Sequence, residues 1–224
     1  MEKQYNNIYM KRFLYFNIYV IKGTNGDILI DTGFIGTKKS IEKWLDSFNI
    51  KLIILTHAHV DHIWNASYLK EKYHCQIALS KNDIKNLDNQ YINSKPLKNR
   101  YKIWTKIMNF GMKHFKPKQF SIDIPLQDKQ IINKFGIKLK IISLPGHTDG
   151  SIGILYNNYL FAGDALVYRG KNPSLAFQNQ NNDDSYHSYQ KIIKLKPNII
   201  FIGHDKEITN TKLEKSFSNL IKEV

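Results

Sequence analysis

Residues 57–62, whose sequence is HAHVDH, place four side chains that bind metal ions within one short segment. An apolar run at residues 52–55, followed by Thr56, precedes this segment. Imidazole groups favour zinc and iron, and carboxylates can bridge two ions or complete the coordination of a second. Three more residues of these types stand beside glycines later in the chain. The full set of five imidazoles and two carboxylates suits a two-metal hydrolytic site: His57, His59, Asp61, His62, His147, Asp164 and His204.

The order of the first four residues suggests how they divide between two ions. His57 and His59 can converge on one ion from a single extended loop. Asp61 and His62 open the next predicted helix and can face a second ion beside the first. Each ion then keeps an open position for water or a substrate oxygen, as catalytic sites require.

The three later residues can complete this arrangement. His147 can complete the first site, His204 the second, and Asp164 can bridge both ions through its two oxygens. The alternative is that the histidines are ordinary core or surface residues. It is disfavoured because five of the eight histidines stand beside glycines or at strand ends.

Alternating and helical apolar patterns predict a sheet scaffold that presents these residues at strand ends and in loops. The pairs Asn25-Gly26 and Asn157-Asn158 indicate hairpin turns. Strands are expected at residues 13–22, 27–31, 51–56, 76–79, 130–135, 137–144, 152–156, 159–162 and 198–202. Helices are expected at residues 37–48, 61–73, 183–195 and 209–222.

Residues 81–120 interrupt this alternation and are predicted to form a helical insertion. The segment holds ten Lys and Arg against two Asp, a net charge of +8 out of +14 for the chain. It could form a lid or pocket wall, in which aromatic residues line an apolar pocket and basic residues meet an anionic substrate. The alternative is an amphipathic helical pair whose aromatic residues are core and whose lysines are solvated. The residues in question are Tyr91, Arg100, Tyr101, Lys102, Trp104, Lys106, Phe110 and Phe115, of which Arg100 and Trp104 are the chosen pocket candidates.

Length and composition predict a single domain over residues 1–224 that includes this insertion. Hydrophobic residues make up 42% of the chain, enough for a sizeable core. The longest apolar stretch is too short to span a membrane, and the polar start favours a cytoplasmic protein. The single cysteine, Cys75, excludes an intramolecular disulfide and is expected to be buried. The basic charge favours anionic partners, but the general richness in Lys, Asn and Ile makes it weak support for nucleic-acid binding.

These motifs resemble the metallo-β-lactamase-fold superfamily. The resemblance rests on residues 56–62, 145–148 (PGHT), 163–164 (GD) and 203–204 (GH), with residues 28–33 (ILIDTG) as the usual upstream strand and turn. The order of these motifs fits over about residues 13–205. The resemblance implies a mixed α/β (α+β) fold, a four-layer αββα sandwich with a helical insertion. It also implies two divalent ions, zinc before iron or manganese. The first would be held by His57, His59 and His147 and the second by Asp61, His62 and His204, with Asp164 between them.

Two further roles follow from this resemblance. An aspartate at the position of Asp31 would lie behind the histidine segment and fix a ligand histidine's tautomer by accepting its other N–H. Asp-Thr-Gly is also good turn chemistry, so a turn role for Asp31 stays open. Tyr168 follows Asp164 at a distance near that of a lactonase tyrosine and could donate a hydrogen bond to an oxyanion. The alternative for Tyr168 is packing or a surface position.

Asp164 also narrows the class of hydrolase. It looks like the bridging aspartate of glyoxalase II-like thioesterases, lactonases and phosphodiesterases, which the β-lactamases generally lack. The expectation is a binuclear hydrolase of a small carbonyl substrate, an ester, thioester or lactone. A hydroxide that bridges the metals would attack the carbonyl, and Asp61 would serve as ligand and proton shuttle. The alternatives are a phosphodiesterase or ribonuclease acting on nucleic acid, less favoured a β-lactamase, and a non-enzymatic metal module. An oligomer is compatible with the sequence but not required by it.

Overall fold

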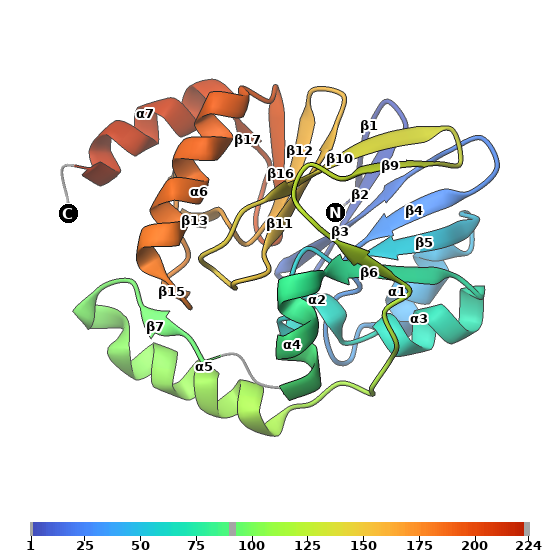
Figure 1. Ribbon diagram of the computed structural model, residues 1–224, viewed down its shortest axis with the longest axis horizontal. Coiled ribbons are helices and arrows are strands. Elements are labelled where there is room, and N and C mark those ends of the chain that lie inside the picture. The colour runs from blue at the N-terminus through green and yellow to red at the C-terminus, as the bar shows by residue number, and fades with distance from the viewer. Residues whose placement is uncertain (1, 90–92, 222–224) are drawn as a thin grey trace.

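Two β-sheets packed face to face form the centre of the molecule, and helices cover both outer faces (Figure 1). This computed structural model describes residues 2–89 and 93–221. The layers are helices, sheet, sheet, helices, so the predicted four-layer αββα sandwich is confirmed. Within the described residues, no helix is long and apolar enough to cross a membrane.

The first sheet begins as an antiparallel meander and continues with parallel strands. Strands β1 to β4 pair antiparallel in sequence, and β5, β6 and β8 then add in parallel. The parallel strands run towards one edge of the sheet, where loops with chemical groups can gather. The strands are β1 Glu2–Tyr5, β2 Ile8–Phe13, β3 Phe16–Ile21, β4 Asp27–Ile30, β5 Ile50–Ile54, β6 Gln76–Ser80 and β8 Ile124–Leu126.

The second sheet has the order β17-β16-β12-β11-β10-β9. Its β9–β10 hairpin turns at Phe135 and Gly136, whose positive φ values of 58° and 74° suit a tight two-residue turn. Strand β16 lies parallel to β12, and the ends of these two strands reach the same edge as β5. The strands are β9 Ile131–Lys134, β10 Ile137–Ser143, β11 Ile152–Tyr156, β12 Tyr159–Gly163, β16 Ile199–Ile202 and β17 Ile208–Thr209.

Three apolar clusters hold the layers together. Alternation along β4 sends Ile28 and Ile30 into the cluster between the sheets, where Phe161 and Phe201 also pack, and Leu29 into the outer cluster. Both faces of the strand are therefore covered, which explains its continuous apolar sequence. Because every layer buries apolar surface on its neighbour, the hydrophobic effect fixes the relative position of the two sheets.

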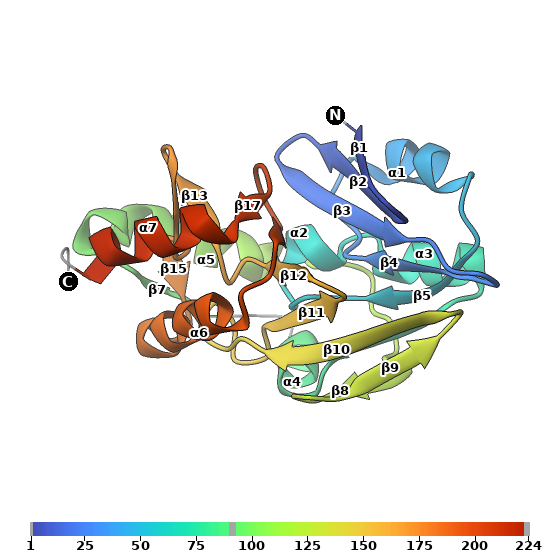
Figure 2. The same ribbon diagram turned by 90° about the horizontal axis from the view of Figure 1, so that it is seen from above.

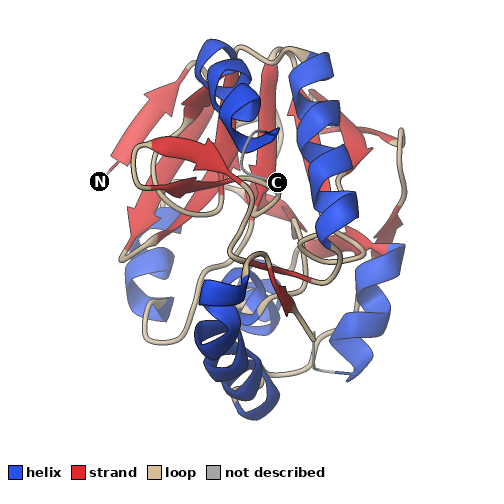
Figure 3. Cartoon of the chain, turned by 90° about the vertical axis from the view of Figure 1, so that its left-hand side faces the viewer, coloured by secondary structure: helices blue, strands red, loops and turns tan. Residues whose placement is uncertain are grey.

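The outer helices differ in the sheet that they cover. Helices α1 Lys38–Leu45 and α3 Ala66–Tyr73 lie against the first sheet (Figure 2). Helices α6 Asn182–Leu195 and α7 Asn210–Ile221 lie across the second sheet, in front of its strands in Figure 3. The Asn181 side chain caps α6 by accepting hydrogen bonds from the N–H groups of Asp183 and Asp184.

The predicted helix over residues 61–73 is broken in two. Helix α2 Val60–Ile63 is a single turn, and α3 begins at Ala66. At the break, the buried Asn65 side chain donates to the carbonyls of Thr32 and Phe34. These long-range hydrogen bonds favour a local conformation that the helical periodicity does not predict. The prediction also missed the edge strand β1 and its neighbour β2, whose short sequences are mixed in polarity.

The described residues between β6 and β8 form two α-helices, one 3-10 turn and one short strand. Helix α4 Lys81–Asn89 precedes β7 Lys95–Pro96, a 3-10 turn at Asn99–Tyr101 and α5 Lys102–His114. Strand β7 pairs with β15 Gln178–Asn179 rather than with either large sheet. A second small hairpin joins β13 Val167–Arg169 to β14 Asn172–Ser174. These additions lie around the edge where β5, β12 and β16 end (Figure 1).

Candidate metal centre

The HAHVDH segment lies at the carboxyl end of β5. Its first residues form an extended loop, and Asp61 and His62 belong to the single turn of α2. The histidine side chains of the segment are buried, at 1% to 4% exposed. The loop is fixed at its start, since the Thr56 N–H and hydroxyl both donate to Asp31. The strand end therefore presents four ligand-type groups from a fixed backbone.

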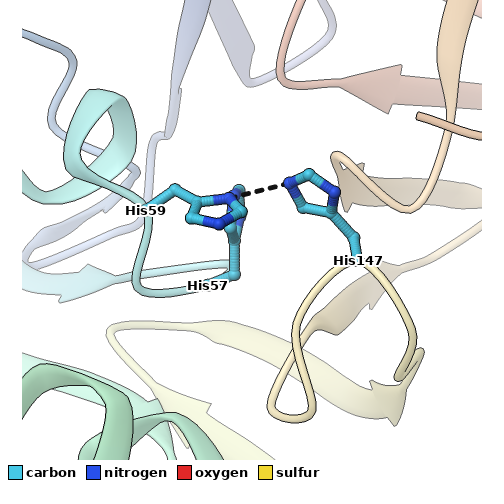
Figure 4. Close-up of side chains that lie close together, drawn as sticks. All are labelled: His57, His59 and His147. Atoms are coloured by element: carbon cyan, nitrogen blue, oxygen red, sulfur yellow. Dashed lines mark hydrogen bonds between the residues drawn. The ribbon is translucent and has the colours of Figure 1, made fainter. Parts of the chain in front are cut away.

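His57, His59 and His147 form the first group (Figure 4). Their candidate ligand atoms lie within 4.8 Å of one another, and all three side chains are buried. His59 Nδ1 lies 2.8 Å from His147 Nε2. His147 comes from the loop after β10, eighty-eight residues from His59 in sequence. The structure therefore brings together the three histidines that the sequence assigns to one ion.

Asp61, His62 and His204 form the second group, also with ligand atoms within 4.8 Å of one another. His204 follows β16, and its Nε2 lies 3.3 Å from Asp61 Oδ2. His62 Nε2 lies 3.9 Å from the same carboxylate oxygen. This group contains the residues that the sequence assigns to the second ion.

Asp164 lies between the two groups. Its carboxylate is 3.5 Å from His62 Nε2, 3.7 Å from His147 Nε2 and 3.1 Å from His204 Nε2. Gly203 makes room for it, because a Cβ on that residue would lie 2.0 Å from Asp164 Oδ1. One carboxylate thus reaches histidines of both groups, as a bridging ligand must.

Unsatisfied polar atoms test whether metal ions fit these residues. His57 Nε2, His62 Nε2 and Asp164 Oδ1 are buried and have no hydrogen-bond partner. Buried polar atoms normally have partners, because leaving one without costs about 1–3 kcal/mol. A divalent ion is a partner that imidazole nitrogen and carboxylate oxygen share. The residues present therefore fit a metal centre.

The opposite ring nitrogens of three ligand histidines are fixed by acceptors. His147 Nδ1 lies 3.1 Å from the Gln178 carbonyl oxygen, and His204 Nδ1 lies 2.9 Å from that of Tyr15. A carbonyl can only accept, so Nδ1 carries a proton in both, and Nε2 is the nitrogen that faces the other ligand-type residues. His62 Nδ1 is held in the same way by Asp31 Oδ2 at 2.8 Å. Asp31 therefore lies where it can fix a ligand histidine's tautomer.

Electrostatics separate the two groups. Burial and the neighbouring His62, His59 and His147 lower the pKa of His57 well below its ordinary value. Burial and His147 lower the pKa of His59 to about 3. These histidines are therefore neutral at pH 7, the form that binds a metal.

The second group is rich in carboxylates, and its histidines shift the other way. Burial opposes the charge on His62, but Asp31, Asp164 and Asp61 outweigh it and raise the pKa of His62. Burial likewise opposes the charge on His204, and Asp164 and Asp61 raise its pKa. The pKa of Asp164 is lowered because His204 and His62 outweigh the effect of its burial. The second group therefore holds cationic charge close to its carboxylates.

Asp83, which the sequence did not single out, links the two loops that carry the first group. From the start of α4, its buried carboxylate accepts from the Ala58 N–H at 2.8 Å and from the Thr148 hydroxyl at 2.9 Å. It also accepts from the Gly150 N–H at 3.0 Å. An acidic residue in the first turn of a predicted helix gave no signal of this role, because such residues commonly interact with the helix N-terminus.

A cavity of about 610 Å³ opens onto both groups. Helix α5 contributes Ile107, Met108 and Gly111 to its wall, Phe115 follows at the C-cap of this helix, and the β13–β14 hairpin contributes Val167, Tyr168 and Arg169. Of the predicted pocket residues in the segment 81–120, Phe115 therefore lines this cavity. Tyr91 lies outside the described residues, and the others do not line it: Arg100, Tyr101, Lys102, Trp104, Lys106 and Phe110.

Arg100 and Trp104, the two chosen candidates, point elsewhere. The Trp104 side chain is 63% exposed, and the Arg100 guanidinium carbon lies 5.0 Å from the centre of the Tyr101 ring. Tyr168 does line the cavity, but its hydroxyl donates to the Glu207 carbonyl oxygen at 3.4 Å. The orientation of α5 about its own axis, which its packing fixes, decides which of its residues reach the cavity.

Comparison with known proteins agrees with this geometry. The sequence pattern of the metallo-beta-lactamase superfamily matches residues 13–204. A probable metallo-hydrolase of Methanocaldococcus jannaschii is 36% identical over 159 residues, which are 69% of this chain and 68% of that protein. Hydroxyacylglutathione hydrolase 1 of Vibrio vulnificus is 25% identical over 201 residues, which are 87% of this chain and 64% of that protein. A metallo-beta-lactamase family protein of Thermus thermophilus shares the fold with a TM-score of 0.71 at 20% identity, over 97% of this chain and 80% of that one.

Proposed function

The chain belongs to the metallo-β-lactamase superfamily and is a metal-dependent hydrolase. From that premise we propose that it is a binuclear hydrolase of a small ester, thioester or lactone. The observation that carries the proposal is the convergence of seven ligand-type side chains beside an apolar cavity, with buried ring nitrogens that lack hydrogen-bond partners.

Two divalent ions, most simply zinc, would be held by the two groups of residues. His57, His59 and His147 would hold the first and Asp61, His62 and His204 would hold the second, with Asp164 shared between them. When bound, such ions polarise a carbonyl oxygen and lower the pKa of water. Asp31 orients His62 from behind, and backbone carbonyls orient His147 and His204.

Asp61 is the proposed proton shuttle. Its side chain is 31% exposed, whereas that of Asp164 is 9% exposed, and both line the cavity. Its pKa is lowered because His62 and His204 outweigh the effect of burial, so the carboxylate is ionised. Its Oδ2 lies 3.3 Å from His204 Nε2 within the second group, and the proposal gives this carboxylate both roles, ligand and proton acceptor.

The cavity favours a carbonyl substrate over nucleic acid. Its α5 wall is formed by apolar side chains, whereas a polynucleotide groove is lined by many Lys and Arg. The name of the Vibrio vulnificus relative denotes hydrolysis of an acyl thioester. An oxyanion role for Tyr168 stays part of the proposal, and it requires the hydroxyl to turn from the Glu207 carbonyl oxygen, 3.4 Å away, towards the cavity that Tyr168 lines.

The test combines metal analysis with a panel of bonds. Protein purified with and without added zinc is assayed for metal content and for hydrolysis of a thioester, an aryl ester, a lactone and a phosphodiester. Two metals per chain, with chelator-sensitive turnover of a carbonyl substrate, would support the proposal. Turnover of the phosphodiester alone would favour the nucleic-acid alternative. Absence of bound metal after reconstitution would overturn the binuclear site.

A further inference from the structure

Arg169 brings a positive charge into the wall of the cavity. It ends β13, is half-buried, and is the only Lys or Arg among the described residues that line this cavity. Apart from Asp205, the other residues that line the cavity outside the two metal groups are apolar or uncharged. A lone guanidinium in such a position is costly to bury unless an anion meets it.

Tyr101 positions this guanidinium. Arg169 Nη1 donates to the Tyr101 hydroxyl at 3.3 Å, and Arg169 Cζ lies 6.0 Å from the centre of the Tyr101 ring. Tyr101 is itself held against Phe177, with ring centres 6.1 Å apart. Arg100 packs on the same tyrosine. The result is a pair of guanidinium groups around one phenol, with one of them in the cavity.

No carboxylate among the described residues lies within ion-pair distance of Arg169. The cavity does hold three acids, but Asp61 and Asp164 belong to the metal groups. The third, Asp205, forms an ion pair with Arg12 at 3.2 Å. The three carboxylates of the cavity therefore interact with other groups, and the guanidinium of Arg169 can form an ion pair with a ligand.

Helix α5 supplies an apolar surface in the same cavity. Ile107 and Phe115 are each 53% exposed and Met108 is 43% exposed, although all three are large hydrophobic side chains. Gly111 lies between them in the cavity wall and leaves room there, because a Cβ at this position would meet nothing within 4 Å. Exposed apolar side chains that line a cavity indicate an apolar ligand group.

We propose that Arg169 selects an amphiphilic substrate, one that places a carboxylate or phosphate on Arg169 and an apolar chain against α5. This inference rests on the proposed function, because it names the substrate class of the same site. A bidentate guanidinium contact would orient the substrate, and the apolar wall would supply most of the buried surface.

Binding is measured first, independently of turnover. Isothermal titration calorimetry compares octanoate, octyl phosphate and neutral 1-octanol on the metal-loaded wild type, Arg169→Gln and Arg169→Lys. The wild type is expected to bind at least one anion about tenfold more tightly than the alcohol, and R169Q to lose about that factor, as for a hydrogen-bonded charge. Comparison of octanoate with octyl phosphate shows whether the Arg169 guanidinium binds a carboxylate or a phosphate more tightly. Lys106→Gln, which removes the same charge from α5 outside the cavity, is the matched control and should bind like the wild type.

Turnover then separates the two proposals. Two octanoyl thioesters are compared, one of anionic 3-mercaptopropionate and one of neutral N-acetylcysteamine. R169Q should lower kcat/KM for the anionic thioester about tenfold and leave the neutral one unchanged. An equal loss on both thioesters, or no anion preference in the wild-type titration, would overturn the inference. Arg169-dependent anion binding without hydrolysis of any carbonyl substrate would overturn the proposed function and leave the binding inference standing.

Discussion

Asp83 Oδ2 accepts a hydrogen bond from the Thr148 hydroxyl at 2.9 Å, which joins residues 65 positions apart. The same oxygen accepts from the Ala58 N–H, within the HAHVDH segment. One buried carboxylate therefore connects the loop that carries His57 and His59 to the loop that carries His147. The positions of His57, His59 and His147 therefore depend on Asp83, which is not itself a candidate metal ligand.

Replacement of Asp83 by Asn should weaken this connection. An amide has one oxygen, so at least one buried donor would face its NH₂ group and lose its partner. We expect the free energy of unfolding to fall by about 1–3 kcal/mol, the cost of an unsatisfied buried group. Thermal unfolding measures the loss, and metal analysis at limiting zinc checks the first group. Asp149→Asn, a nearby exposed carboxylate, should change stability by less than about 0.5 kcal/mol. Wild-type stability in D83N would contradict the assigned role.

Asp31→Asn tests the support behind His62. The substitution keeps the side-chain shape but removes the charge that holds the His62 Nδ1–H, and Asn tolerates the φ of 60° found here. Metal affinity at the second group should fall about 10- to 100-fold. Competition with a zinc-binding dye gives this affinity.

Asp27→Asn is the control, because Asp27 is an equally buried carboxylate at the other end of β4 that accepts from the backbone N–H groups of Gly23 and Asn49. D27N should lose stability but not metal affinity. Equal metal loss in both variants would point to general destabilisation.

Asp164 and His204 should differ in the number of sites that they affect. Asp164 lies near histidines of both groups, whereas His204 reaches only the second. Asp164→Ala is therefore expected to lower the metal affinity of both sites, because Asp164 would be a ligand in each. His204→Ala should lower the metal affinity of the second site alone, because His204 would be a ligand only there. Metal content after dialysis against a weak chelator distinguishes the two. A single retained metal in D164A with wild-type affinity would show that Asp164 is not shared.

Gly111 offers a test of the cavity wall. Because a Cβ fits freely there, Gly111→Ala should stabilise α5 by about 0.5–1 kcal/mol and leave hydrolysis unchanged. Gly111→Phe should also permit folding but fill part of the cavity. Turnover of an octanoyl thioester should then fall about tenfold while that of an acetyl thioester is retained. A loss that is equal for both chain lengths would place the acyl group elsewhere.

The Lys3–Glu207 ion pair predicts part of the acid sensitivity of the fold. Partial burial opposes ionisation of Glu207, but the hydrogen bond from Lys3 at 2.8 Å outweighs it and lowers the pKa of the carboxyl. Since the pKa is lower in the folded state, the stabilisation is present above the unfolded value of about 4.3 and is lost as pH falls through the folded pKa. Glu207→Gln should therefore reduce the free energy of unfolding at pH 7 by less than about 1 kcal/mol.

Urea unfolding at pH 7 and at pH 3 measures this difference, which should shrink towards zero at the lower pH. The exposed pair Glu71–Lys118 supplies a control, because Glu71→Gln should have a smaller effect at pH 7. A difference for E207Q that grows as the pH falls would contradict the sign of the shift.

Much of the site is determined by the sequence alone, because its signals are local. The apolar run before His57 predicts the buried strand β5, and the strand end fixes where the histidine segment stands. Glycines beside His147, Asp164 and His204 mark close turns at other strand ends. Periodicities of two and 3.6 residues then predict most of the strands and helices, since each pattern reflects which side of an element is buried.

Only the tertiary structure decides what lies between elements far apart in the chain. The break at Asn65, the connection made by Asp83 and the contact of Tyr101 with Arg169 all depend on partners at least 25 residues away. The rotation of α5 is a further case, since buried Thr105 faces the protein and leaves Ile107 and Phe115, rather than Trp104, to the cavity. An amphipathic pattern tells which face of a helix is apolar, but packing decides what that face meets.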